Sequence, residues 1–211
     1  MNLKTFLFLI GSAGFAFVAA CGGGEDMSHD TDTDADAITD AEPAPEPVAA
    51  TFDLGGGTAM EVHPGQAGSP HVKTDWTVGD AAVSITYGRP LLKGRVVGDD
   101  VEPTADKFWR LGADEATTLT TDTDLMLGGT HVPAGEYTLF TQHMNDEFHL
   151  IVNSETGQWG TAYNADNDVA HIAMDVTELD PPAEQLTISI ADDQLGFEWG
   201  QMAASVSLAT N

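Results

Sequence analysis

Positive charge is the scarcest feature of this 211-residue chain. Seven Lys and Arg stand against thirty-four Asp and Glu, which gives a formal net charge of −27. A surface this acidic repels nucleic acid and anionic lipid, so neither is expected as a partner of the folded part. The shortage of lysine and the excess of aspartate favour a protein from a high-salt habitat. The alternative is an acidic secreted protein of no special habitat.

Cysteine is almost absent, and Cys21 is the only one. No internal disulfide can form, so the stability of the domain must come from a hydrophobic core. The other scarce feature is a long apolar run. Residues 6–18 form the only candidate, and it is too short to span a bilayer stably. A run of this length near the start of the chain indicates a signal peptide over residues 1–20.

The sequence before Cys21 is Val-Ala-Ala, and small residues at these positions resemble the lipobox of bacterial lipoproteins. The resemblance implies lipidation of Cys21, which would anchor the chain firmly to a membrane. Gly22 after the cysteine favours the outer membrane by the same resemblance, and the acidic pair Glu25-Asp26 resembles a signal for export to the cell surface. The alternative is an ordinary secretory signal with an incidental cysteine.

Residues 21–50 are predicted to form a disordered acidic tether rich in proline. They contain almost no large apolar side chains and cannot bury enough surface to offset the entropy of ordering. The stretch DTDTDAD at 30–36 resembles a calcium loop, but Ala35 and Ala41 occupy the positions where an EF-hand needs Gly and Glu. We therefore predict a spacer and not a calcium site.

Residues 51–211 are long enough for one domain with a sizeable core, and they carry six cations against twenty-five acids. Alternation of apolar side chains, as at Val83, Ile85 and Tyr87, recurs in short segments separated by turn residues. This pattern predicts an all-β fold, a single antiparallel β-sandwich or a barrel-like domain. A short helical turn is expected at 106–111. The strand-like segments are 81–89, 115–127, 134–143, 147–154, 168–179, 184–193 and 202–210.

Five stretches occur in an order that resembles a known bacterial family. They are SITYGRPLLKGR, FWRLGADEATTL, PAGEYTLFT, FHLIVN and QWG. Together they resemble the family called domain of unknown function 2911, from about residue 69 to about residue 207. The resemblance implies a secreted or envelope β-rich domain, and it implies no established activity. The chain departs from the family pattern at Asp114, where Asn is expected, and in 97–107, which is longer and more acidic.

Scarce cations gather in the first of these stretches and shortly after it. Arg89, Arg95 and Arg110 each offer a planar fork of donors to a carboxylate, phosphate or carbonyl. In one interpretation they form a partly buried network with Asp114 and Glu115 that holds the fold. In the other they line a cleft for an anionic or hydroxyl-rich ligand.

Aromatic residues flank these cations, as a sugar-binding surface would require, although aromatic residues in β-domains are more often part of the core. Seven histidines are scattered with no H-x-H or HExxH spacing, so no metal and no cofactor are predicted. No motif identifies a catalytic residue. The candidate ligand-binding residues are Tyr87, Arg89, Arg95, Trp109, Arg110 and Glu115.

The sequence thus predicts a surface-tethered lipoprotein whose domain binds an envelope or extracellular ligand without catalysis, with a glycan or a small polar molecule as the candidate. One alternative is an extracellular enzyme that uses Glu115, Asp114 or His71 as acid or base. Another is a structural envelope protein with no small ligand. A cleft with a strongly perturbed carboxylate would favour the enzyme, and buried arginines under a flat acidic face would favour the structural protein.

Overall fold

The computed structural model describes residues 50–105, 107–144 and 147–210. The predicted signal peptide, the lipidation site Cys21 and nearly all of the predicted tether lie outside these residues. The described strands belong to one compact unit, Glu46–Asn211. Within the described residues, no helix is long and apolar enough to cross a membrane.

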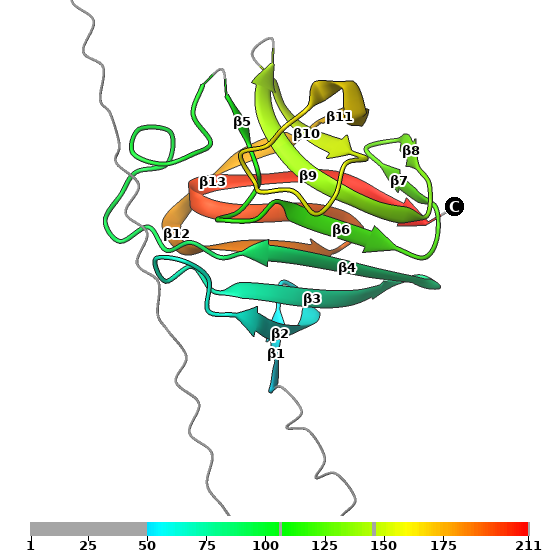
Figure 1. The fold of residues 1–211 in the computed structure, drawn as a ribbon, viewed down its shortest axis with the longest axis horizontal. Helices are drawn as coiled ribbons and strands as arrows, with labels where there is room; N and C mark the ends of the chain where they lie inside the picture. The colour runs from blue at the N-terminus through cyan, green and yellow to red at the C-terminus, as the bar shows by residue number, and fades with distance from the viewer. Residues whose placement is uncertain (1–49, 106, 145–146, 211) are drawn as a thin grey trace, which may run out of the picture. The chain divides into compact units, whose positions relative to one another are not determined.

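The fold is a sandwich of two antiparallel sheets, which confirms the predicted fold class (Figure 1). The first sheet has the strand order β1-β2-β3-β4-β6-β9-β10-β11, and β5 pairs with β9 beside this path. Its strands are β1 Thr51–Leu54, β2 Gly57–His63, β3 His71–Val78, β4 Ala81–Gly88, β5 Phe108–Trp109, β6 Thr117–Thr121, β9 Gly135–Met144, β10 Glu147–Asn153 and β11 Asp168–Ala173.

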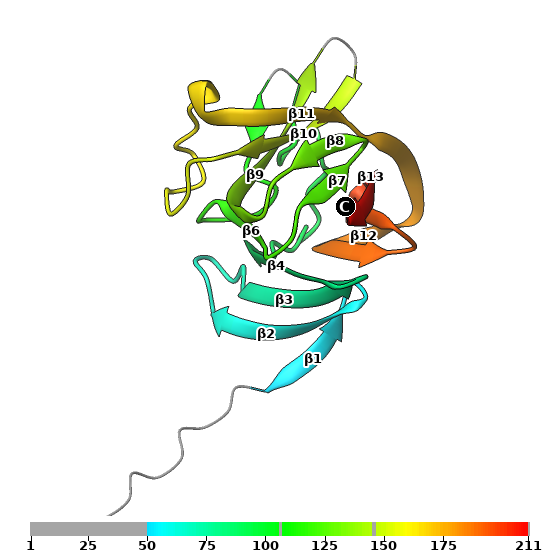
Figure 2. The same cartoon turned by 90° about the vertical axis from the view of Figure 1, so that its right-hand side faces the viewer.

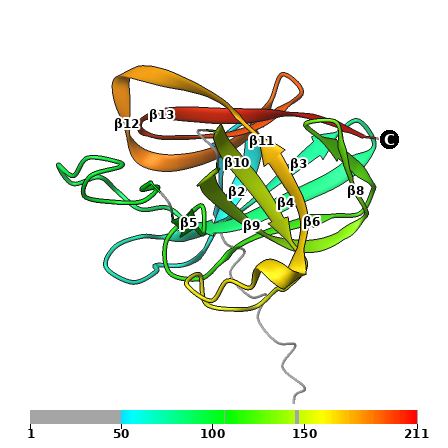
Figure 3. The same cartoon turned by 90° about the horizontal axis from the view of Figure 1, so that it is seen from above.

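The second sheet has the order β12-β13-β7-β8, and it packs against one face of the curved first sheet (Figures 2 and 3). Both sheets keep free edges in the described part of the chain, so the barrel-like alternative is not what forms. A single-turn 3-10 helix, η1 Ala165–Asn167, precedes β11. The strands of the second sheet are β7 Leu125–Leu127, β8 Thr130–Val132, β12 Asp175–Ala191 and β13 Gln194–Thr210.

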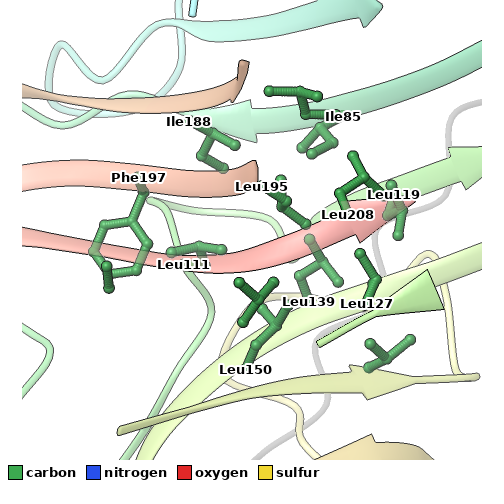
Figure 4. Close-up of a cluster of buried hydrophobic side chains, with 14 of the residues drawn as sticks. Ile85, Leu111, Leu119, Leu127, Leu139, Leu150, Ile188, Leu195, Phe197 and Leu208 are labelled. Atoms are coloured by element: carbon green, nitrogen blue, oxygen red, sulfur yellow. The ribbon is translucent and has the colours of Figure 1, made fainter. Parts of the chain in front are cut away.

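The core lies between the two sheets, and β4 shows how the sequence builds its half. Val83, Ile85 and Tyr87 alternate along the strand and are at most 2% exposed, because successive side chains of a strand point to opposite faces. Ile188 and Phe197 face them from the second sheet (Figure 4). Burial of this continuous apolar layer is what stabilises a domain that has no disulfide.

The helical turn expected at 106–111 does not form. Phe108 and Trp109 instead form β5, which pairs with Gln142 and Thr141 of β9. Phe108 packs on Phe140 on one side of the sheet, while Trp109 is buried on the other. Neighbouring side chains point to opposite faces only when the backbone is extended. Packing of Phe108 and Trp109 on opposite faces of the sheet therefore favours a strand over a helical turn.

The second sheet is tied to the first through the chain that follows β4. Leu92 N–H donates to the carbonyl of Glu184, and Leu186 N–H donates to the carbonyl of Pro90. Leu91 and Gln185 form an isolated antiparallel bridge between these bonds. The segment 89–92 therefore runs along the edge of β12 and leads directly into the loops that surround a pocket of about 590 Å³.

Candidate functional site

A pocket with a volume of about 590 Å³ lies at the end of the sandwich where β5 begins. Three loops form its walls: 64–70 between β2 and β3, 89–107 between β4 and β5, and 110–116 between β5 and β6. The first two loops lie on the same side of the fold in Figure 1. A pocket built from loops on a rigid sandwich is the usual place for a binding site in a β-domain.

Four of the six cations of the domain line this pocket, namely Lys93, Arg95, Lys107 and Arg110. Lys93 Nζ reaches across to the carbonyl of Ala67 at 3.2 Å and so connects two of the loops. The lining also holds four carboxylates, at Asp99, Asp100, Glu102 and Asp114. The pocket thus combines donors for an anion with acceptors for hydroxyl groups.

Arg110 is the most distinctive of these cations. Its Nε is inaccessible to solvent and has no hydrogen-bond partner among the described residues. Burial lowers the pKa of its guanidinium, and the nearby carboxylates of Asp114 and Glu102 oppose that effect. The stem of Arg110 lies against Gly160, where an added Cβ would come within 1.9 Å of Arg110 Cδ. Arg110 also lines a second pocket of about 330 Å³.

The other predicted arginines already have partners. Arg89 Nε donates to the carbonyl of Leu186 at 3.0 Å, and its Nη2 donates to the hydroxyl of Thr187 at 3.0 Å. Arg95 Nε and Nη2 donate to the carbonyls of Leu92 and Leu91. Arg89 therefore serves the contact between the sheets, whereas Arg95 shapes its own loop while still lining the pocket.

The predicted aromatic residues lie in the core and not on an open platform. Tyr87 is fully buried, and its hydroxyl oxygen accepts a hydrogen bond from Ile188 N–H at 3.0 Å. Burial raises the pKa of Tyr87. Trp109 is 4% exposed and touches the pocket only along its edge, with its ring packed edge-on against Phe197.

Glu115, the last predicted residue, lies beside the pocket in a histidine cluster. Its Oε2 is 2.9 Å from Nε2 of His71, and its Oε1 is 3.8 Å from Nε2 of His63. The two imidazole rings stack with centroids 4.2 Å apart and planes 18° apart. Asp114 Oδ2 is 3.6 Å from Nε2 of His71, so the cluster and the pocket share a wall.

The strand register explains this cluster. His63 ends β2, His71 begins β3, and the two are directly paired across the antiparallel ladder. Asp114, with φ of +62°, turns the backbone so that Glu115 can pair with Trp159 in an isolated bridge. The left-handed conformation favours Asn, Asp or Gly, which accounts both for Asp114 and for the Asn expected there.

Sequence reasoning did not select His63. Its spacing of eight residues from His71 matches no metal motif. The two positions come together only because β2 and β3 form a hairpin that closes over 64–70. Burial lowers the pKa of His71, with Glu115 opposing this effect and His63 reinforcing it.

The sequence matches the family described as Protein of unknown function (DUF2911) over residues 69–208. The matched range begins just before β3 and includes the whole wall of the pocket from Pro90 to Asp114. A search of curated proteins finds no match, and a search of solved structures finds none. The chain belongs to the DUF2911 family, whose function is not known.

Proposed function

We propose that the domain binds a small, hydroxyl-rich ligand carrying a carboxylate, the chemistry of an acidic sugar, in the pocket of about 590 Å³. The observation that carries the proposal is the buried Nε of Arg110, which has no partner among the described residues and borders that pocket. Nε of Arg110 is closed to solvent in this conformation, so the side chain must shift before an anion in the pocket can accept from it. The donor then recovers the free energy that an unpaired buried group costs.

The charges around the pocket support this choice of ligand. The fork of Arg110 matches the two oxygens of a carboxylate, and Lys93 and Lys107 add positive potential. The carboxylates of Glu102 and Asp114 accept hydrogen bonds from hydroxyl groups but repel a highly charged anion such as a polyphosphate. A ligand with one acidic group and several hydroxyls can bind both the cations and the carboxylates that line the pocket.

The test is a calorimetric titration of the unit Glu46–Asn211 with galacturonate, glucose and inorganic phosphate at high salt. Galacturonate is expected to bind more tightly than either of the others. Arg110→Gln should weaken its binding at least about tenfold, since a charge-assisted hydrogen bond contributes roughly 1.5–3 kcal/mol. Lys73→Gln is the matched control, because it removes one positive charge from a strand outside this pocket.

Two results would reject the proposal. In the first, glucose binds as well as galacturonate, so the acidic group contributes nothing. In the second, Arg110→Gln and Lys73→Gln weaken binding equally, so only the net charge matters.

In this proposal the chain is a lipoprotein of the outer membrane, and Cys21 attaches it to the lipid through the segment 21–50. The support is the small residues before the single cysteine and the acidic, proline-rich composition after it. Mass spectrometry of the chain from its native cells should find diacylglycerol on Cys21 at a new N-terminus. Cys21→Ser should abolish both the modification and the membrane association, while a cysteine found unmodified would exclude the anchor.

A further inference from the structure

We propose that His63, His71 and Glu115 form a binding site for one divalent transition-metal ion of the Zn²⁺ class. One ligand atom from each of the three side chains lies within 4.8 Å of the other two. Two imidazoles and one carboxylate are a ligand set that suits Zn²⁺ and also accepts Co²⁺ or Ni²⁺. Mg²⁺ and Ca²⁺ prefer sites made wholly of oxygen. This site lies beside the proposed sugar pocket, with Asp114 between them, and the proposal does not depend on sugar binding.

The most direct evidence is a pair of buried atoms without partners. Nε2 of His71 and Oε2 of Glu115 are both inaccessible to solvent, and neither has a hydrogen-bond partner in the described structure although they are 2.9 Å apart. His71 is only 2% exposed. With the proton of His71 on Nδ1, its Nε2 presents a lone pair beside the carboxylate oxygen, which is costly when both are buried, and a cation bound to both atoms satisfies them at once.

The geometry leaves room for the ion. Tetrahedral coordination at about 2.0–2.2 Å places neighbouring ligand atoms roughly 3.3 Å apart. The two imidazoles lie against different oxygens of the Glu115 carboxylate: Nε2 of His71 is 2.9 Å from Oε2, and Nε2 of His63 is 3.8 Å from Oε1. A metal ion lies in the plane of each imidazole that binds it, so the ring of His63 must turn out of its stack on His71 when the ion binds. The side chains of His63 and Glu115 are 41% and 47% exposed, which leaves both free to reorient.

One existing contact must change when the ion binds. Gly65 N–H donates to Nδ1 of His63 at 3.2 Å, which places the proton of the neutral ring on Nε2. Ligation through Nε2 moves that proton to Nδ1, where solvent can accept it because the side chain is 41% exposed. Ligation through Nε2 of His71 likewise requires that its ring carries the proton on Nδ1. The ion then keeps a fourth position toward solvent, where water or a ligand oxygen can bind.

The experiment is a titration of the metal-free unit Glu46–Asn211 with ZnCl₂ by calorimetry, and with CoCl₂ by visible absorption. Millimolar Mg²⁺ is present throughout to occupy carboxylates elsewhere on this acidic surface. We expect one Zn²⁺ per chain, and Co²⁺ should give the intense visible bands of a low-coordinate site with nitrogen ligands. Glu115→Gln and His63→Ala should each weaken Zn²⁺ binding by about 100-fold or more.

His131→Ala is the matched control. His131 Nε2 is 2.8 Å from Asp124 Oδ2 on the surface. This variant therefore removes a histidine that pairs with one carboxylate but is not one of the three proposed metal ligands. Its Zn²⁺ affinity should stay within twofold of the parent. Glu115 and His63 are nearly half exposed, so their variants are expected to fold, and circular dichroism checks this. The test therefore does not need a variant of the buried His71.

The proposal is overturned if Zn²⁺ binds with no defined stoichiometry. It is equally overturned if Glu115→Gln and His63→Ala bind Zn²⁺ as the parent does, because the metal would then sit elsewhere. Arg110→Gln separates this site from the pocket. It should leave Zn²⁺ affinity unchanged while it removes sugar binding, so either proposal can fail without the other.

Discussion

Arg89 Nε donates a hydrogen bond of 3.0 Å to the main-chain carbonyl of Leu186, and the two residues are 97 positions apart in the sequence. The bond links the end of β4 in the first sheet to β12 in the second. Arg89 therefore holds the two sheets together, whereas Nε of Arg110 has no hydrogen-bond partner among the described residues.

Arg89→Gln should therefore lower the stability of the domain. We expect the free energy of unfolding to fall by about 1.5–3 kcal/mol, since hydrogen bonds from a charged donor are lost. The measurement is urea unfolding in high salt. Arg95→Gln is the control and should change stability by no more than about 0.5 kcal/mol, because Arg95 is exposed and bonds only within its own loop. Equal losses in the two variants would remove the distinction between them.

Tyr87→Phe should destabilise the domain although it adds no bulk. The variant leaves Ile188 N–H buried without an acceptor, which costs about 1–3 kcal/mol. Tyr137→Phe serves as the comparison. The hydroxyl of Tyr137 donates to the carbonyl of Pro133 in an exposed turn, where water can replace it. Thermal unfolding of both should give the larger decrease for Tyr87→Phe, and the reverse order would contradict the burial argument.

Gly160→Ala should disturb the pocket through Arg110. The new Cβ would lie 1.9 Å from Arg110 Cδ and 2.7 Å from the carbonyl oxygen of Asp114, so the arginine stem must move. We expect galacturonate binding to weaken at least about fivefold, as preorganisation of the fork is lost. Thr161→Ala, at the exposed neighbouring position, should bind as the parent does. Unchanged affinity in Gly160→Ala would mean that the position of Arg110 does not matter.

Asp124 provides a prediction in acid. The pKa of its carboxyl is lowered by the hydrogen bond from Ala134 N–H first, and then by His131. A lowered folded-state pKa contributes stability that is present above the unfolded value of 3.8 and is lost as the pH falls through the folded value. Asp124→Asn should thus be less stable than the parent at pH 6, and the difference should shrink below pH 3.8.

Unfolding curves at pH 6 and at about pH 3 test this, because these two pH values lie on either side of the range in which most carboxyl groups titrate. Asp80→Asn, in the exposed turn before β4, is the control and should follow the parent at both pH values. A difference between parent and Asp124→Asn that grows in acid would have the wrong sign.

Much of the fold could be predicted from the sequence because strands with one buried face carry their signal locally. The alternation of Val83, Ile85 and Tyr87 reports burial directly, and it gave β4 and its inward face. The helical turn predicted at 106–111 was wrong because this segment carries no such local signal. Two residues, Phe108 and Trp109, are too few to show a strand or helix periodicity in the sequence. Their pairing with β9 determines their extended conformation.

The candidate site was harder to predict because its contacts are distant in sequence. Composition indicates that the arginines are scarce, but nothing local to Arg89 reveals that Leu186 accepts from it. His63 and His71 meet through strand register, and a register that shifts at a bulge cannot be read from one sequence. Glu115 joins them only after the left-handed turn at Asp114 has formed.

The contacts that join the second sheet to the first sheet and to the pocket wall also impose an order on folding. Tyr87, Arg89 and Glu102 bond to partners in β12 and β13 that lie 97 to 101 residues later in the chain. Contacts of this range form slowly, since a long loop must close before they stabilise anything. A chain that is synthesised or exported from its N-terminus therefore has no finished pocket until its last two strands have emerged. A fragment that stops before β13 would lack Trp199, which lines the pocket and donates to the carbonyl of Glu102.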